Sequence, residues 1–89
     1  MMTEEDVLQK VRDYVAENFL YMRKNKELGD DESLLRTGVI SSLGMMELVG
    51  WVEETFGLAV DPAEITEQNF DSLNSIARFV SAKRSLSAA

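Results

Sequence analysis

Apolar residues recur every three or four positions in three stretches of the chain, and no stretch alternates apolar and polar residues as a strand would. The first stretch follows Thr3, which precedes three consecutive acids in the manner of a helix N-cap. Its apolar stripe consists of Val7, Leu8, Val11, Val15 and Phe19. This spacing predicts an amphipathic helix over residues 4–20.

The second stretch, "SSLGMMELVGWVEETFG", begins with a serine that can cap a helix and ends with Gly57 at the position that favours a left-handed residue. We therefore predict a helix over residues 42–56. Its core face would contain Met45, Leu48, Val49, Val52 and Phe56. A neighbouring stripe mixes apolar and acidic side chains and is predicted to be exposed: Leu43, Met46, Glu47, Gly50 and Glu54. The pattern leaves the role of Trp51 open.

Two further helices are predicted in the last third of the chain. A short one spans residues 62–68, with Asp61 as its N-cap. The other spans residues 72–84, with Asp71 as its N-cap and Ser72 in its first turn. Its core face would contain Leu73, Ile76, Ala77 and Val80. The tail at 85–89 is expected to be flexible.

Residues 22–40 show no sustained period and predict a long loop. Four apolar residues are candidates to pin it to the core: Leu34, Leu35, Val39 and Ile40. The acids at 30–32 do not match the alternating ligands of a calcium loop, so no metal is expected. The pattern as a whole predicts one all-α domain over residues 1–89, a bundle of three main helices plus one short helix.

The composition argues against an enzyme. The chain has 89 residues and contains no Cys and no His, so the commonest nucleophile, general base and metal ligands are missing. Its acidic N-terminus is not a signal peptide, and no run approaches the ~20 apolar residues of a membrane span. These features predict a soluble, cytoplasmic, monomeric protein that binds no nucleic acid.

The net charge of −7 is concentrated in the second half of the chain. Between residues 37 and 77 there is no Lys or Arg, and there are seven acids: Glu47, Glu53, Glu54, Asp61, Glu64, Glu67 and Asp71. Such a segment repels nucleic acid and attracts basic protein surfaces, although an acidic face that only confers solubility would look the same.

The order of these features resembles the acyl carrier protein family over nearly the whole chain. In that family an Asp-Ser-Leu opens the second helix, a Glu-Leu pair follows, and an acidic pair with Phe-Gly closes it. The matching residues here are Leu43, Glu47, Leu48, Glu53, Glu54, Phe56 and Gly57. The start of the last helix, "NFDSLNSIA", also fits the family pattern.

The resemblance implies an acyl-carrier-like bundle whose serine receives 4′-phosphopantetheine, and whose loaded arm carries acyl groups as thioesters. The absence of Cys and His from the chain agrees with a carrier function, because the cofactor would supply the reactive sulfur. The carrier itself would catalyse no reaction. Its partners would be the phosphopantetheinyl transferase and acyl-handling enzymes, docking on Leu43, Met46, Glu47 and Glu54. The core could also open to shelter an acyl chain among Met45, Leu48, Val49, Phe56, Ile65 and Ile76, although ordinary packing explains these residues equally well.

Two serine-leucine pairs compete for the arm. Ser72 lies in the only Asp-Ser-Leu triplet, yet a basic-ended helix and the C-terminus follow it. Ser42 lacks the preceding aspartate, but every later landmark falls in register behind it, and a helix N-terminus suits a phosphodiester. Attachment at Ser41 would put Leu43 one residue too late. We therefore predict Ser42, against the alternative that both serines only cap a helix.

Ser41 stands where the family usually has aspartate. Serine caps a helix about as well, but it lacks a charge worth ~0.3–1 kcal/mol near a helix N-terminus. In the family that aspartate contributes to recognition by the transferase, so three explanations stay open: natural tolerance, a specialised transferase, or an engineered or degenerate carrier.

The predicted function is an acyl carrier for fatty-acid, polyketide or related biosynthesis. Two alternatives stay open: a D-alanyl, aminoacyl or peptidyl carrier, or a degenerate helical interaction module without the arm.

Overall fold

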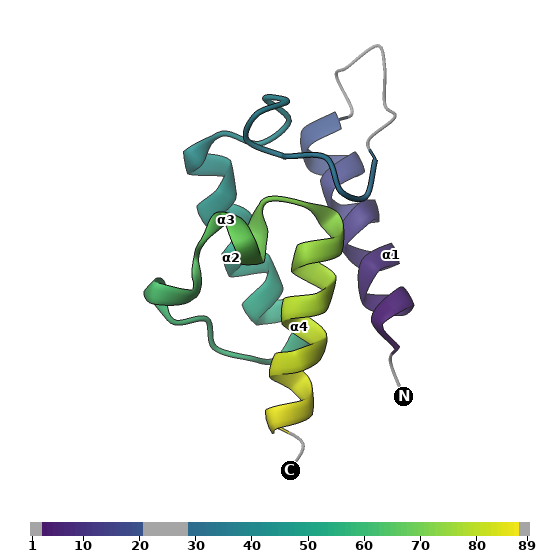
Figure 1. The fold of residues 1–89 in the computed structure, drawn as a ribbon, viewed down its shortest axis with the longest axis vertical. Helices are drawn as coiled ribbons and strands as arrows, with labels where there is room; N and C mark the ends of the chain where they lie inside the picture. The colour runs from purple at the N-terminus through teal and green to yellow at the C-terminus, as the bar shows by residue number, and fades with distance from the viewer. Residues whose placement is uncertain (1–2, 21–28, 88–89) are drawn as a thin grey trace.

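The structure is a computed structural model that describes residues 3–20 and 29–87, and every regular element in that part of the chain is helical (Figure 1). Helix α1 (Glu4–Val15) continues into a π-helical turn, η1 (Ala16–Leu20). Helix α2 spans Ser42–Phe56, and a 3₁₀ turn, η2 (Pro62–Glu64), follows it. Helix α3 (Glu67–Phe70) is one turn long, and α4 spans Leu73–Ser87. The predicted all-α bundle is confirmed.

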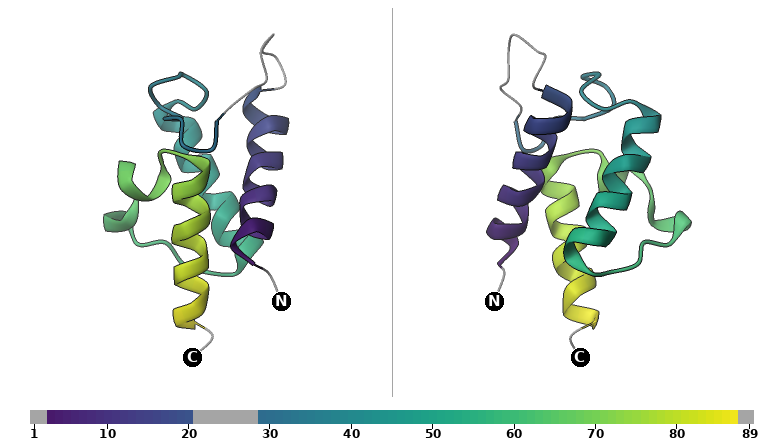
Figure 2. Two further views of the ribbon diagram at one scale, coloured as in Figure 1. Left: turned by 45° about the vertical axis from the view of Figure 1, so that its right-hand side comes forward. Right: turned by 180° about the vertical axis from the view of Figure 1, so that it is seen from behind.

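Helices α1 and α4 lie side by side and run antiparallel, and α2 packs against them (Figures 1 and 2). The beginning of α1 and the end of α4 therefore lie at one end of the bundle, and the beginning of α2 lies at the other end. The core faces predicted for α2 and α4 are confirmed, because all nine residues are buried. From α1 the core receives Val7, Val11 and Val15.

The predicted short helix over 62–68 is wrong in its extent, because the segment divides into two capped turns. Ile65 has φ −82° and ψ 81°, which ends η2. Thr66 then adopts an extended conformation, and its side chain accepts a hydrogen bond from the backbone N–H of Asn69 at 3.3 Å. Two β-branched residues in succession favour this extended connection over a continuous helix.

Helix α4 also differs from the prediction. Its N-cap is Ser72 rather than Asp71, since the Ser72 hydroxyl accepts from the backbone N–H of Ser75 at 3.1 Å. The helix continues to Ser87 through part of the predicted flexible tail, and residues 88–89 lie outside the described residues.

The loop before α2 is attached to the core by three of the four predicted residues. Leu34, Val39 and Ile40 are buried. Leu35 is 38% exposed, so its prediction as a core residue is wrong; it lies on the surface instead. Residues 22–28 of the predicted loop lie outside the described residues.

Aromatic side chains join α1 to α2, which gives Trp51 a structural role that the sequence did not reveal. The indole of Trp51 stacks on the ring of Tyr14 with centroids 4.3 Å apart, and it meets Phe56 edge-on at 5.6 Å. Burial, with a smaller contribution from the nearby Glu47 carboxylate, raises the pKa of Tyr14. The row of rings therefore belongs to the packing between the two helices.

Two glycines of α2 should differ in how substitution by alanine changes the stability of the protein. A Cβ at Gly50 would meet no atom within 4 Å, so Gly50→Ala should raise the free energy of unfolding by about 0.5–1 kcal/mol, the difference in helix propensity. A Cβ at Gly44 would lie 2.9 Å from the ring of Phe19, so Gly44→Ala should lose that gain. Urea unfolding of both variants checks this, and equal stabilisation by both would contradict the packing described here.

Within residues 3–20 and 29–87, no helix has the length and apolar character needed to cross a membrane.

Candidate functional site

The beginning of α2 is a well-formed helix N-terminus built by Ser41. This residue is extended (φ −82°, ψ 172°), and its hydroxyl accepts a hydrogen bond from the backbone N–H of Gly44 at 3.1 Å. Its carbonyl accepts the first helical bond, from Met45 at 2.8 Å. Ser41 therefore uses its side chain as the cap, the role in which serine and aspartate are equivalent.

Ser42 is the first residue of α2, and its side chain is exposed. Among the described residues, no hydrogen-bond partner meets its hydroxyl group. It sits where the helix dipole and free backbone N–H groups favour an anion. The position thus combines an available hydroxyl oxygen with an environment that suits a phosphodiester.

Ser72, the serine of the Asp-Ser-Leu triplet, lies in a different environment. It is only 8% exposed, and its hydroxyl donates to the hydroxyl of Ser75 at 2.9 Å while accepting from the backbone of that residue. A large group on this oxygen would displace both hydrogen bonds and the packing around them.

The same triplet fastens the loop before α2 to the start of α4. The carboxylate of Asp71 accepts from the Ser33 hydroxyl at 2.6 Å and from the backbone N–H of Leu35 at 3.1 Å. Its backbone carbonyl accepts from the N–H of Leu34 at 2.8 Å. We call Ser33, Leu34, Leu35 and Asp71 the brace. The brace makes Asp71 a link between two segments that lie far apart in the sequence.

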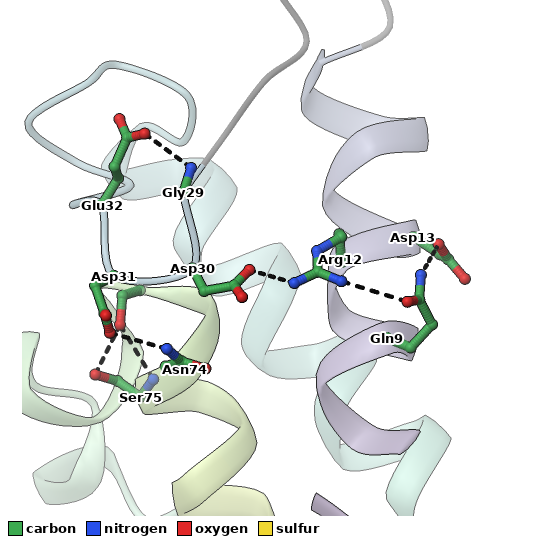
Figure 3. Close-up of polar contacts among 10 residues, drawn as sticks. Gln9, Arg12, Asp13, Gly29, Asp30, Asp31, Glu32, Asn74 and Ser75 are labelled. Atoms are coloured by element: carbon green, nitrogen blue, oxygen red, sulfur yellow. Dashed lines mark hydrogen bonds and ion pairs between the residues drawn. The ribbon is translucent and has the colours of Figure 1, made fainter. Parts of the chain in front are cut away.

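A second set of polar contacts holds the preceding part of the loop. Figure 3 shows the Asn74 side chain donating to the Asp31 carboxylate, at 2.9 Å, and Arg12 of α1 paired with Asp30. The backbone N–H of Asn74 also donates to the carbonyl of Asp30 at 2.9 Å. The loop is therefore fixed to both α1 and α4 before it reaches Ser41.

An apolar groove of about 250 Å³ borders Ser42, between α2 and the segment that carries α3. Its lining comprises Leu35, Ser42, Met45, Met46, Ile65, Thr66, Glu67, Phe70 and Asp71. Of the six predicted lining residues of an acyl shelter, Met45 and Ile65 lie here. Leu48, Val49, Phe56 and Ile76 are buried in the core and do not line this groove.

One ion pair holds the outer wall of the groove against α4. Glu64, next to the wall residue Ile65, pairs with Lys83. The hydrogen bond from the Lys83 ammonium, together with one from the backbone of Asp61, lowers the pKa of Glu64. The Glu64 carboxylate thus serves both η2, as the second half of its capping box, and the contact with α4.

The stripe of α2 predicted to be exposed is confirmed as exposed. Leu43 and Met46 are 75% and 56% exposed, unusually high values for large apolar side chains. Glu47 and Glu54 are exposed as well, and neither forms an ion pair with a described residue. An apolar and acidic surface therefore begins directly beside Ser42.

Comparison with protein families provides the deciding observation. The family described as "phosphopantetheine attachment site" matches residues 9–80, most of the chain. The chain belongs to this family. The predicted resemblance to carrier proteins and the predicted cofactor, covalently attached 4′-phosphopantetheine, are confirmed by this match. A comparison with curated proteins found no match.

The residues around Ser42 fit the phosphopantetheine group of this family. An exposed hydroxyl at a capped helix N-terminus can form and stabilise a phosphodiester, and an apolar groove lies beside it. Sequence reasoning did not assign five of the groove residues to the site, because only the packing of segments distant in the sequence brings them beside Ser42: Leu35, Thr66, Glu67, Phe70 and Asp71. It also missed the brace, since a hydrogen bond over more than thirty residues of chain leaves no local signal.

Proposed function

We propose that this chain is a carrier protein whose phosphopantetheine arm is attached to the hydroxyl oxygen of Ser42. The observation that carries the proposal is the contrast between the serines: Ser42 is exposed at the start of a fifteen-residue helix, whereas Ser72 is buried and hydrogen-bonded. Ser41 is exposed too, but its hydroxyl already caps the helix. The family match supports attachment somewhere in the chain, and this contrast favours Ser42.

The chain's own contribution to the chemistry is small and specific. The Ser42 oxygen would form the new ester bond to the phosphorus that carries pantetheine in coenzyme A, and its proton would pass to the transferase. The pyrophosphate bond of coenzyme A would break in this step, and adenosine 3′,5′-bisphosphate would leave. The start of α2 then stabilises the anionic diester through its dipole and its free N–H groups. When bound, the arm supplies a terminal thiol that carries the cargo as a thioester. We propose no reaction catalysed by the chain itself.

The partner surface we propose consists of Leu43, Met46, Glu47 and Glu54. Its two carboxylates form no ion pair with a described residue, and residues 37–77 contain no Lys or Arg. A basic patch on a transferase or an acyl-handling enzyme would be steered toward this helix, and the apolar side chains would fix the register of docking. Contacts of this kind suit a monomeric carrier that must leave each enzyme in turn.

The cargo we propose is an acyl group of fatty-acid, polyketide or related biosynthesis, in the cytoplasm. The apolar groove beside Ser42 favours an acyl group over a charged one. A D-alanyl, aminoacyl or peptidyl cargo is the second candidate, because the exposed Glu67 on the groove wall could meet an ammonium group.

Intact-mass measurement tests the proposed function. The chain is incubated with a phosphopantetheinyl transferase of broad specificity, coenzyme A and Mg²⁺. We expect a mass gain of one phosphopantetheinyl group and no second addition. No gain with several transferases, under conditions where a known carrier is fully loaded, would favour the interaction module without the arm.

Charge reversal on α2 should slow loading. For Glu47→Lys combined with Glu54→Lys, we expect kcat/KM of the transferase to fall at least about tenfold at low salt, because electrostatic steering is lost or reversed. Added salt should narrow the difference. The control is Glu5→Lys with Glu17→Lys on the exposed side of α1 and η1, which changes the net charge equally. An equal loss in both double variants would contradict the assignment of the surface to α2.

A further inference from the structure

We infer that Asp71, outside the attachment helix, is a positioning residue for the loading of Ser42. This inference rests on the proposed function and names a second segment that the reaction needs. Asp71 belongs to the Asp-Ser-Leu triplet, whose serine is buried and capping α4. We thereby infer that the Asp-Ser-Leu triplet has a positioning role at the attachment site through Asp71, although we propose that its own serine is not the one modified.

A continuous path of hydrogen bonds connects Asp71 to the start of α2. The carbonyl of Asp71 accepts from the N–H of Leu34 at 2.8 Å. The carbonyl of Leu34 in turn accepts from the N–H of Ile40 at 3.1 Å, and Ile40 immediately precedes the cap residue Ser41. Two backbone hydrogen bonds therefore separate Asp71 from the turn that presents Ser42.

The carboxylate of Asp71 fixes the geometry of that path. It accepts from the Ser33 hydroxyl at 2.6 Å and from the Leu35 N–H at 3.1 Å, so it holds the chain on both sides of Leu34. The Ser33 hydroxyl also accepts from the N–H of Arg36 at 3.0 Å. Hydrogen bonds to a charged acceptor are stronger than those between neutral groups, so the carboxylate dominates this small network.

The packing of two buried residues, Leu34 and Ile40, couples the position of the brace to the beginning of α2. Leu34 is fully buried and Ile40 is 1% exposed, so neither side chain can shift without disturbing the core. Asp71 and Ser42 also border the same groove. Loosening the brace should therefore release the first turn of α2, while the docking residues beyond that turn, Met46, Glu47 and Glu54, keep their places.

This arrangement predicts a specific kinetic effect. Three of the four docking residues lie beyond the first turn of α2, so KM for the carrier should stay within about twofold in Asp71→Ala. The turnover number should fall about tenfold, because Ser42 spends less time in the position where its oxygen can react. Asp71→Asn keeps an oxygen acceptor for the Leu35 N–H, and its NH₂ group can donate to the Ser33 hydroxyl instead of accepting from it. Because these neutral hydrogen bonds are weaker than those of the carboxylate, Asp71→Asn should restore part of the turnover.

The matched control is Val80→Ala. Val80 is fully buried two turns further along α4, so its truncation weakens the core without touching the brace. All variants are assayed at a temperature at which circular dichroism shows them folded. Should Asp71→Ala fail to fold, Ser33→Ala removes the hydrogen bonds of the Ser33 hydroxyl with Asp71 and with the Arg36 N–H, and it is also expected to lower turnover.

Amide hydrogen exchange on the unloaded protein tests the brace independently of loading. In Asp71→Ala the N–H groups of Leu34, Ile40 and Gly44 should exchange about tenfold faster relative to that of Val11, while Val80→Ala should show no such local excess. Unchanged exchange at these amides, or an equal fall in turnover in Asp71→Asn and Asp71→Ala, would overturn the inference. If the wild-type chain is not loaded at all, the proposed function fails, and the exchange result still decides whether the brace exists.

Discussion

Ser42→Ala should abolish loading completely, leaving a chain whose intact mass does not change after incubation with transferase, coenzyme A and Mg²⁺. The substitution removes the only oxygen that the proposal makes available for the phosphodiester. It should leave the fold intact, because Ser42 is exposed and alanine is the best helix former. Mass spectrometry after exhaustive incubation checks this prediction.

Ser72→Ala is the informative control for this result. It removes the N-cap of α4 and the hydrogen bonds to Ser75, so the free energy of unfolding should fall by about 0.5–2 kcal/mol. The chain should still accept one phosphopantetheinyl group. Ser41→Ala should likewise be loaded despite losing the cap of α2. If Ser42→Ala is still loaded, or if Ser72→Ala stays folded but is not loaded, our assignment of the arm to Ser42 is wrong.

Leu48→Ala should destabilise the protein more than any substitution on the exposed side of α2. Leu48 is fully buried at the centre of the core, and truncating such a leucine costs about 2–5 kcal/mol. A small domain has roughly 5–15 kcal/mol of stability in total, so a large part of it would be lost. Urea unfolding followed by circular dichroism should show a clearly lower midpoint with little change in slope.

Leu43→Ala makes the same chemical change on the same helix and serves as its control. Leu43 is 75% exposed, so its truncation should alter the free energy of unfolding by less than about 0.5 kcal/mol. We expect it instead to raise KM for the transferase. Equal destabilisation by the two substitutions would mean that the division of α2 into a core face and a docking face is incorrect.

The sequence was sufficient to predict the core because its evidence is local. Spacings of three and four identified the buried faces of α2 and α4, and Gly57 marked the end of α2 in the left-handed conformation that the structure contains (φ 64°). The exposure of Leu43 and Met46 followed from the same periodicity. These features depend on residues within one or two helical turns of each other.

The errors arose where distant segments decide the conformation. Asp71 reads as a helix cap, because an acid before a serine and an apolar run is a common cap signal. In the structure its carboxylate is engaged by Ser33 and Leu35 instead, so Ser72 takes the role of cap. Leu35 was predicted to be buried with its neighbours, but the brace turns it toward the groove beside Ser42.

The candidate site also combines features with a local sequence signal and features that depend on distant segments. Landmarks within fifteen residues predict Ser42 as the attachment residue, and this stays a prediction. The structure adds that Ser41 caps α2 without a charge, because its hydroxyl accepts the hydrogen bond of the Gly44 N–H that a capping aspartate would accept. The groove could not be predicted, because its walls come from the loop before α2, from α2 and from the segment around α3. Only their packing brings these three together.

Localisation of the modification tests the central claim most directly. The wild-type chain is loaded to one phosphopantetheinyl group, digested and fragmented in a mass spectrometer, so that the added mass is assigned to a single residue. We predict that the fragment ions place the whole addition on Ser42, with Ser41 and Ser72 unmodified. An addition located on either of those serines, or on any other residue, would contradict the account.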